Sequence, residues 1–273
     1  MTQPQGTALI TGASSGIGEE FARQLAARGW SLILVARSQD RLEALRSELM
    51  SAHMGIDILA VALDLTVPGA PEELFQRTQA ANLEVTLLIN NAGFGAHGEF
   101  ASIDRERQRQ MIVLNIAALV ALTHLYLQPM IKRRGGGVIN IASVAGFLPL
   151  PYSAVYASTK AFVRSFSEAL HEEVHQQGVH VLAVHPGSTQ TKFFQVAGES
   201  MFNNPARMQT AAQVVEESLR AFDRHKGSVV TGASNRLVVR VLALVPSSWV
   251  TRFMGKAIRR ASAQHSGATK PSR

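Results

Sequence analysis

The chain alternates short apolar runs with longer segments of helical periodicity, and this alternation restricts the fold more than any other feature. We expect strands at Thr7–Thr11, Ser31–Ala36, Ile58–Leu63, Val85–Asn90, Val138–Ala142, Val179–His185 and Ser228–Thr231. Helices are expected at Gly16–Arg28, Gln39–His53, Pro71–Ala81, Asp104–Arg134, Ala154–Gln177 and Ala211–Arg224. Strands that are apolar nearly throughout are typical of a parallel sheet covered on both faces. The pattern therefore predicts an α/β fold with a doubly wound sheet.

Composition limits the chemistry. At 273 residues, of which 46% are apolar, the chain can bury one large core, and we expect one main domain. It contains no cysteine, which excludes disulfides, a thiolate nucleophile and a thiolate metal site. The N-terminus shows no signal segment, and we find no run of about 18 apolar residues, so we expect a cytoplasmic protein.

The formal net charge of +7 is concentrated near the C-terminus. From Arg224 onward there are ten Lys and Arg and no Asp or Glu, whereas the preceding residues carry 17 basic against 20 acidic side chains. A nucleic-acid-binding domain carries its positive charge along the face that binds. We therefore expect no nucleic-acid partner and interpret the basic excess as a C-terminal appendix.

A glycine-rich turn joins the first strand to the first helix. Gly12, Gly16 and Gly18 follow the pattern G-x-x-x-G-x-G, which differs from the plain dinucleotide fingerprint. These glycines permit a tight turn, let backbone N–H groups approach a pyrophosphate at the helix N-terminus, and allow the helix to pack on the strand. An ordinary strand–helix connection is the alternative. The same stretch fits a nucleophile elbow centred on Ser14, although such elbows follow a later strand in mid-sheet.

Tyr156 and Lys160 are four residues apart, which places their side chains one turn apart on one face of the expected helix. A phenol has a pKa of about 10 when unperturbed, and a nearby positive charge lowers it. The pair is therefore suited to general acid–base catalysis at neutral pH. An accidental pair of exposed side chains is the alternative, and the other motifs of the chain decide against it.

Five motifs in order carry a family resemblance: Thr11–Gly18, Asn90–Gly93, Asn115, Ser143 and Tyr156–Lys160. Over about residues 6–232 the chain resembles the classical short-chain dehydrogenase/reductase family. The resemblance implies a single Rossmann-like domain, with about seven parallel strands in the order 3-2-1-4-5-6-7 and helices on both faces.

The resemblance also implies roles for four residues. Tyr156 is the general acid/base, while Lys160 lowers the pKa of Tyr156 and holds the nicotinamide ribose. Ser143 binds the substrate carbonyl, although a serine at a strand end can simply cap a turn. Asn115 completes the proton relay by holding a water at a local break in its helix. An amide in that apolar run needs a partner if it is buried.

The residues after the second strand indicate the cofactor. NAD-preferring members of the family resemble one another in carrying Asp where this chain has Ala36, and Arg37 follows, whose planar charge suits a 2′-phosphate. The resemblance therefore implies NADP(H). A strand-end turn is the alternative role for Asp64, which resembles the adenine contact. The complete expected cofactor set is Gly12, Ser14, Ser15, Gly16, Ile17, Gly18, Arg37, Asp64, Leu65, Asn90, Tyr156, Lys160, Pro186, Gly187, Thr189 and Thr191.

The stretch 171–175 fits H-E-x-x-H, the helical zinc-protease pattern. We expect no metal there, because a buried stripe formed by Phe162, Phe166, Leu170 and Val174 would leave both histidines beside it, toward the polar face.

Two apolar segments are expected to shape the substrate pocket: residues 147–151, and residues 193–202, where the family keeps a mobile lid. They imply an apolar carbonyl or alcohol substrate, such as a lipid, a steroid-like alcohol or an aromatic ketone. Packing of these residues on each other or on a neighbouring subunit is the alternative.

The C-terminal region is longer than the family core requires. Residues 235–261 combine apolar stripes at helical spacing with basic residues and are broken at Pro246, which indicates basic amphipathic helices. Such helices lie on an anionic membrane surface, or pack on the domain or a partner subunit. We therefore divide the chain into a catalytic domain (1–234), a helical extension (235–261) and a flexible tail (262–273), and expect a homodimer or homotetramer.

The sequence thus predicts an NADP(H)-dependent oxidoreductase that interconverts an alcohol and a ketone or aldehyde on an apolar substrate. Two alternatives stay open: a non-catalytic dinucleotide-binding regulator on the same fold, and a serine hydrolase that uses Ser14. The presence of the complete catalytic set favours the enzyme, because a regulator has no need of all four residues.

Overall fold

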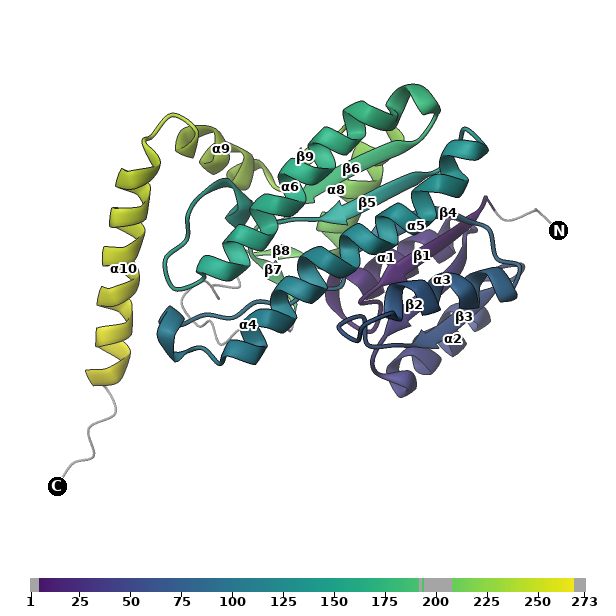
Figure 1. Ribbon diagram of the computed structural model, residues 1–273, viewed down its shortest axis with the longest axis horizontal. Helices are drawn as coiled ribbons and strands as arrows, with labels where there is room; N and C mark the ends of the chain where they lie inside the picture. The colour runs from purple at the N-terminus through teal and green to yellow at the C-terminus, as the bar shows by residue number, and fades with distance from the viewer. Residues whose placement is uncertain (1–4, 192, 194–207, 268–273) are drawn as a thin grey trace.

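A computed structural model describes residues 5–191, 193 and 208–267. Seven parallel strands form one sheet in the order β3-β2-β1-β4-β5-β6-β9, with helices on both faces (Figure 1). The predicted doubly wound sheet and its strand order are confirmed, with β9 as the seventh strand. The strands are β1 (Thr7–Thr11), β2 (Ser31–Ala36), β3 (Ile58–Ala62), β4 (Val85–Asn90), β5 (Gly137–Ile141), β6 (His180–His185) and β9 (Ser228–Val230).

The helices alternate with these strands, and two follow the last one. They are α1 (Gly16–Ala27), α2 (Gln39–Ala52), α3 (Ala70–Ala80), α4 (Arg105–Ile112), α5 (Leu119–Lys132), α6 (Ala154–Val174), α8 (Ala211–Asp223), α9 (Ala233–Leu242) and α10 (Ser247–Gly267). Short helical segments are η1 (Phe100–Ser102), η2 (Val113–Ala118), η3 (Val144–Phe147) and η4 (His175–Gln177). A small parallel pair, β7 (Thr189–Gln190) with β8 (Gln209–Thr210), was not predicted. Residues 194–202 of the expected lid lie outside the described residues.

The core lies on both faces of the sheet. Every residue of β5 and β6 is buried, as expected for strands covered on two sides. Phe21 of α1 and Leu42 of α2 pack on one face, while Leu122 and Met130 of α5 pack on the other. The carboxyl ends of these rigid, buried strands carry the candidate site.

Helices α4 and α5 continue through the π-helical η2 as one helix, Arg105–Lys132, which agrees with the single helix expected at Asp104–Arg134. An 18-residue window of this helix has a mean hydropathy of 1.8, so by length and composition it could cross a membrane. Tyr126 and Met130 are buried in the core against the sheet. The long apolar run that we did not find in the sequence therefore belongs to a helix that packs in the core.

The expected buried stripe of α6 was also wrong in part. Phe162 is 40% exposed and stacks on Phe166, whereas Lys160, Val163 and Ser167 face the interior. Small and polar residues occupy this face because the helix lies close to the sheet and to polar partners there. Hydrophobicity by itself thus gave the wrong face at the start of the helix.

Two boundaries of the predicted division of the chain fall inside helices. The boundary at residue 234 falls inside α9, and the boundary at residue 261 falls inside α10, which continues to Gly267. The division remains a prediction, and natural units for the extension are α9 and α10 themselves.

Candidate active site

The glycine-rich turn lies at the carboxyl end of β1, where the strand order reverses between β1 and β4. Gly16 has φ +60° and begins α1, after the N-cap Ser15, whose side chain makes no capping hydrogen bond. A Cβ on Gly18 would lie 2.3 Å from the carbonyl oxygen of Gly12, so only glycine permits this close packing. Ser14 is half-buried, and Ile17 packs on the core.

Asn90 and Asn91 have different surroundings. The Asn90 side chain is buried and donates to Thr123 Oγ1 (3.0 Å) and Asn140 Oδ1 (2.9 Å), so it braces β4 against α5 and β5. The Asn91 side chain instead donates to the carbonyl oxygen of Gly12 at 3.3 Å. Asn91, which our cofactor set omitted, is therefore the asparagine that touches the glycine-rich turn.

The segment after β6 approaches the same turn. A Cβ on Gly16 would lie 3.0 Å from Cγ2 of Thr191, which places this threonine against the start of α1. Pro186 is buried and its carbonyl accepts from the Val144 amide, while Thr189 is buried and donates to the carbonyl of Gly187. The predicted residues of this segment thus lie along one path from η3 to the glycine-rich turn.

The arrangement fits a nicotinamide dinucleotide. The N-terminal amides of α1 supply donors and a positive dipole end, and the side chain of Ser15 is not used to cap the helix. Side chains in place of Gly16 or Gly18 would collide with Thr191 or Gly12. When such a cofactor is bound, the residues at the glycine-rich turn would hold its pyrophosphate.

Arg37 and Asp64 lie at the ends of β2 and β3. The Arg37 guanidinium is 81% exposed and lies 4.0 Å from Asp64 Oδ2. Asp64 Oδ1 accepts from the amide and the hydroxyl of Thr66, which is the turn role left open by the sequence. Leu65 is buried in the core cluster next to Asp64.

Lys160 is buried beneath Tyr156. Its Nζ lies 5.9 Å from the centre of the Tyr156 ring and donates to the carbonyl of Ile141 at 2.7 Å. Burial lowers the pKa of the Lys160 ammonium from 10.5 to about 8, because the charged form is poorly solvated. Among the described residues no carboxylate bonds to this ammonium, and a buried cation without such a partner is costly, which points to a functional reason for its position.

Ser143 is placed by the tight contact between η3 and α6. It is the N-cap of η3 and accepts from the Ala145 amide at 3.1 Å, while its Oγ lies 3.5 Å from the carbonyl of Pro186. A Cβ on Gly146 would lie 2.7 Å from the Lys160 carbonyl group, so glycine allows η3 to rest on α6. Ser143 and Lys160 thereby belong to one packed unit.

Asn115 lies in the π-helical segment η2, so the expected local break is present. Its Nδ2 donates to the Phe94 carbonyl (3.0 Å) and to Thr159 Oγ1 (3.1 Å), and its Oδ1 accepts from the Phe94 amide (3.2 Å). Thr159 in turn donates to the carbonyl of Tyr156. The buried amide therefore joins η2 to the helical turn that carries Tyr156 and Lys160.

Two further residues border Tyr156: Thr159, which was not assigned to the site by sequence, and Phe193, which begins the segment expected to shape the substrate pocket. The sequence does offer a signal for Thr159. It is a polar residue inside a helix, directly before Lys160, and a polar side chain that is buried there needs a hydrogen-bond partner. Phe193 lies 5.4 Å from Tyr156 between ring centres. A small cavity at the start of α6 is lined mainly by apolar side chains: Ala96, Phe100, Ile103, Met111, Ala154 and Val155.

The alternative motifs lack the contacts that their chemistry needs. Ser14 forms no hydrogen bond to a histidine within the part of the chain that is described. The His171 and His175 rings stack 5.9 Å apart, and His171 also packs on His180. Across residues 5–191, 193 and 208–267, no group of three His, Cys, Asp or Glu side chains is placed to hold a metal ion.

Fold and site together define a dinucleotide-dependent oxidoreductase of the short-chain type. Residues 6–201 match the short chain dehydrogenase family, and the chain belongs to this family. It is accordingly an oxidoreductase with an NAD(P)(H) site that acts on a small molecule.

Its relatives act on different substrates. The chain is 33% identical, over 69% of its length, to a very-long-chain 3-oxoacyl-CoA reductase of Macaca fascicularis, and spans only 61% of that protein. It is 38% identical to a serine 3-dehydrogenase of Agrobacterium fabrum, over 69% of this chain and 74% of that one.

Solved structures extend the similarity to nearly the whole chain. A short-chain dehydrogenase from Sphingobium yanoikuyae in complex with NADPH is 31% identical, covers 98% of both chains and has a TM-score of 0.79. The bulky-bulky ketone specific alcohol dehydrogenase from Comamonas testosteroni is 28% identical, with a TM-score of 0.76 and coverage of 99% and 97%.

Proposed function

We propose that the protein is an NADP(H)-dependent oxidoreductase that interconverts an alcohol and a ketone or aldehyde on an apolar substrate. One observation carries the proposal: the buried ammonium of Lys160 lies under the ring of Tyr156, next to the η3 turn that holds Ser143. A regulator that only senses a dinucleotide gains nothing from burying a cation at a phenol.

The four residues divide the chemistry among them. The Lys160 ammonium favours the phenolate form of Tyr156, so the phenol can give a proton to a developing alkoxide or take one from an alcohol. Ser143 contacts Pro186 only at 3.5 Å, which leaves its hydroxyl to donate to the substrate carbonyl. An ammonium has three donors, so the bond to Ile141 leaves Lys160 donors for a ribose. The nicotinamide cofactor, when bound, supplies or accepts the hydride.

Preference for NADP(H) is supported by the end of β2. Ala36 provides no carboxylate to bind a ribose 2′-hydroxyl, and Arg37 extends into solvent beside it. Asp64 lies 4.0 Å from Arg37 and would compete with a phosphate for it, but that ion pair is long and exposed. The NADPH complex of the Sphingobium protein points in the same direction.

An apolar substrate is supported by the side chains around Tyr156. Phe193, an apolar aromatic side chain, borders the Tyr156 ring. Phe147 instead packs on His185 beneath Arg164, so for this residue the packing alternative holds. The Comamonas relative, described as specific for bulky-bulky ketones, fits this class better than the serine 3-dehydrogenase does.

The test is turnover of a panel of apolar ketones and alcohols, followed by NADPH absorbance, for the wild type and Tyr156→Phe. The variant should lose turnover while NADPH affinity changes little. Tyr126→Phe is the matched control, because the Tyr126 hydroxyl bonds to Thr78 in the core. A Tyr156→Phe enzyme with more than about a tenth of wild-type kcat would have lost less than about 1.4 kcal/mol, and Tyr156 would not be the general acid.

The panel and a labelling experiment separate the other function classes. NADPH binding without turnover of any panel member would support the regulator. Covalent labelling of Ser14 by a fluorophosphonate would support the hydrolase.

A further inference from the structure

Helix α9 presents an apolar face to solvent. Five large apolar side chains are more than a third exposed, and their spacing places them on one side of the helix and its C-terminal end. They are Leu237, Val238, Val241, Leu244 and Val245. Arg236 and Arg240 flank this face, and no described residue covers it.

Helix α10 continues the surface with aromatic and basic residues. Trp249 and Phe253 are 69% and 73% exposed, and Lys256 and Arg260 follow on the same side of the helix. Ile258, on the opposite side, and Val250, between the two sides, are buried. A helix with this division has an inner face that anchors it to the protein and an outer face that remains available.

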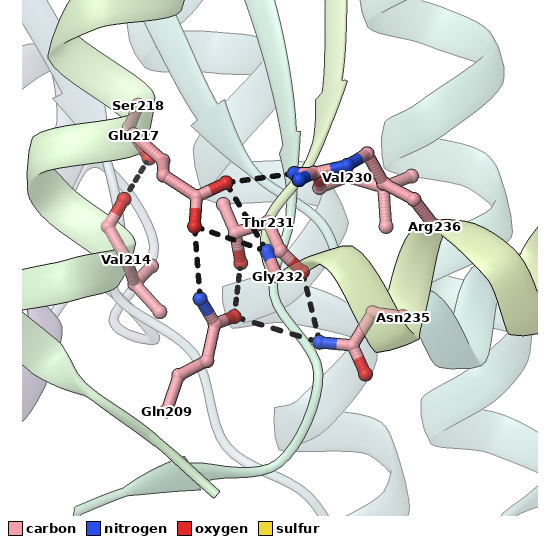
Figure 2. A network of polar contacts seen from close by, with 9 residues as sticks. All are labelled: Gln209, Val214, Glu217, Ser218, Val230, Thr231, Gly232, Asn235 and Arg236. Carbon is pink, nitrogen blue, oxygen red and sulfur yellow. Dashed lines mark hydrogen bonds and ion pairs between the residues drawn. The ribbon is translucent and has the colours of Figure 1, made fainter.

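A polar network holds α9 in its orientation. Figure 2 shows Glu217 of α8 accepting from Gln209, from the Gly232 amide and from Arg236 (2.9 Å). Asn235, the first turn of α9, donates to the carbonyl of Thr231 and lies against Gly187. The start of α9 is thereby fixed to the domain, and its apolar face is turned outward.

We propose that the outer faces of α9 and α10, which we call the C-terminal surface, bind an anionic membrane surface. Trp and Phe side chains beside Lys and Arg are typical of proteins that bind at the membrane interface, where lipid headgroups meet acyl chains. Arg240, Lys256 and Arg260 are exposed beside this surface, and the sequences of α9 and α10 contain no Asp or Glu, so two copies of this surface would repel each other. An anionic bilayer would bury the apolar side chains and attract the positive charge, whereas a second copy would bury the apolar side chains but repel the charge.

The C-terminal surface is attached close to the site. Helix α9 contacts η3, which carries Ser143, and a Cβ on Gly255 of α10 would lie 3.6 Å from Pro151. Membrane binding would therefore bring η3 and the neighbouring Ser143 close to the lipid. The binding proposal does not depend on which substrate the enzyme uses.

The test is co-sedimentation of the full chain with vesicles of phosphatidylcholine alone and of phosphatidylcholine with phosphatidylserine. We expect the anionic vesicles to bind about tenfold more protein at about 0.1 M salt, and raising the salt to about 0.5 M to release most of it. Equal binding to both vesicles, or a wild type that stays in the supernatant, would overturn the proposal.

Two pairs of substitutions locate the contact. Trp249→Ser with Phe253→Ser should weaken binding about tenfold, whereas Phe100→Ser, which removes a comparably exposed aromatic (66%) elsewhere, should not. Lys256→Glu with Arg260→Glu should abolish binding, whereas Arg41→Glu with Arg105→Glu, which makes the same change in net charge, should reduce it much less.

Light scattering and thermal unfolding complete the test. The proposal expects all variants to keep the wild-type mass, and the charge variants to keep its melting temperature. A smaller mass after Trp249→Ser with Phe253→Ser would show that the C-terminal surface joins two copies, and would overturn the proposal. The salt release of the wild type needs no variant, so it decides the matter even if a variant fails to fold.

Discussion

Replacing Lys160 by methionine should stabilise the protein at neutral pH, and the gain should disappear as the solution becomes alkaline. Lys160 is buried, and its pKa falls from 10.5 in the unfolded chain to about 8 in the fold. One pKa unit corresponds to about 1.4 kcal/mol, so at pH 7 burial of the ammonium costs about 3 kcal/mol. The variant also loses the hydrogen bond to Ile141, which lowers its stability by about 1 kcal/mol. The net effect is that the free energy of unfolding of Lys160→Met exceeds that of the wild type by about 2 kcal/mol at pH 7.

The sign of the pH dependence follows from the two pKa values. Between pH 8 and 10.5 the unfolded chain holds more protons at Lys160 than the fold does, so wild-type stability rises with pH. Methionine binds no proton. The difference between the two free energies of unfolding should therefore shrink by about 2.5 kcal/mol from about pH 7 to about pH 10.

The assay is urea unfolding without cofactor at several pH values, for the wild type, Lys160→Met and Lys256→Met. All other titrating groups are shared, so their contributions cancel in the comparison. The exposed Lys256 control should follow the wild type at every pH. Parallel curves for wild type and Lys160→Met would refute the reasoning, because they would show that the burial of Lys160 places no cost on its charge.

Three further predictions follow from other contacts. Arg37→Asp should shift cofactor preference from NADPH toward NADH, measured by fluorescence titration of both, and unchanged NADPH affinity would remove Arg37 from the site. Gly146→Ala should lower kcat and cost about 1–3 kcal/mol of stability, because the new methyl group meets the backbone of Lys160; a fully active enzyme would contradict this. Burial lowers the pKa of His180 to about 4, so stability should fall as the pH drops from 6.5 toward 4, and His180→Phe should reduce that slope by about 1.4 kcal/mol per pH unit; an unchanged slope would show that His180 takes up no proton on unfolding.

Some of this architecture is readable from the sequence. The seven strands and most helix boundaries follow from apolar runs and helical periodicity, because each depends on residues that are close together in the chain. The strand order was implied by the family resemblance and is confirmed by the fold. The break around Asn115 was expected from the family pattern and appears as η2. The proximity of Tyr156 and Lys160 follows from helix geometry alone.

Other features depend on contacts between distant segments. The Asn90 side chain points into the core, and the Asn91 side chain bonds to Gly12. The position of β4 beside β1 determines these two orientations. Phe162 is exposed, and Lys160 is buried on the face that hydrophobicity would have left open. This reversal follows from the close approach of η3 at Gly146.

The extension shows the same division. Its charge and its two amphipathic helices were evident in the sequence, but which face each helix presents was not. Glu217 and Gln209, which precede α9 in the chain, fix the start of that helix and leave its apolar side uncovered. Helical periodicity shows that a stripe exists; only the packing of the whole chain determines whether the stripe is buried or exposed, because burial depends on what lies opposite.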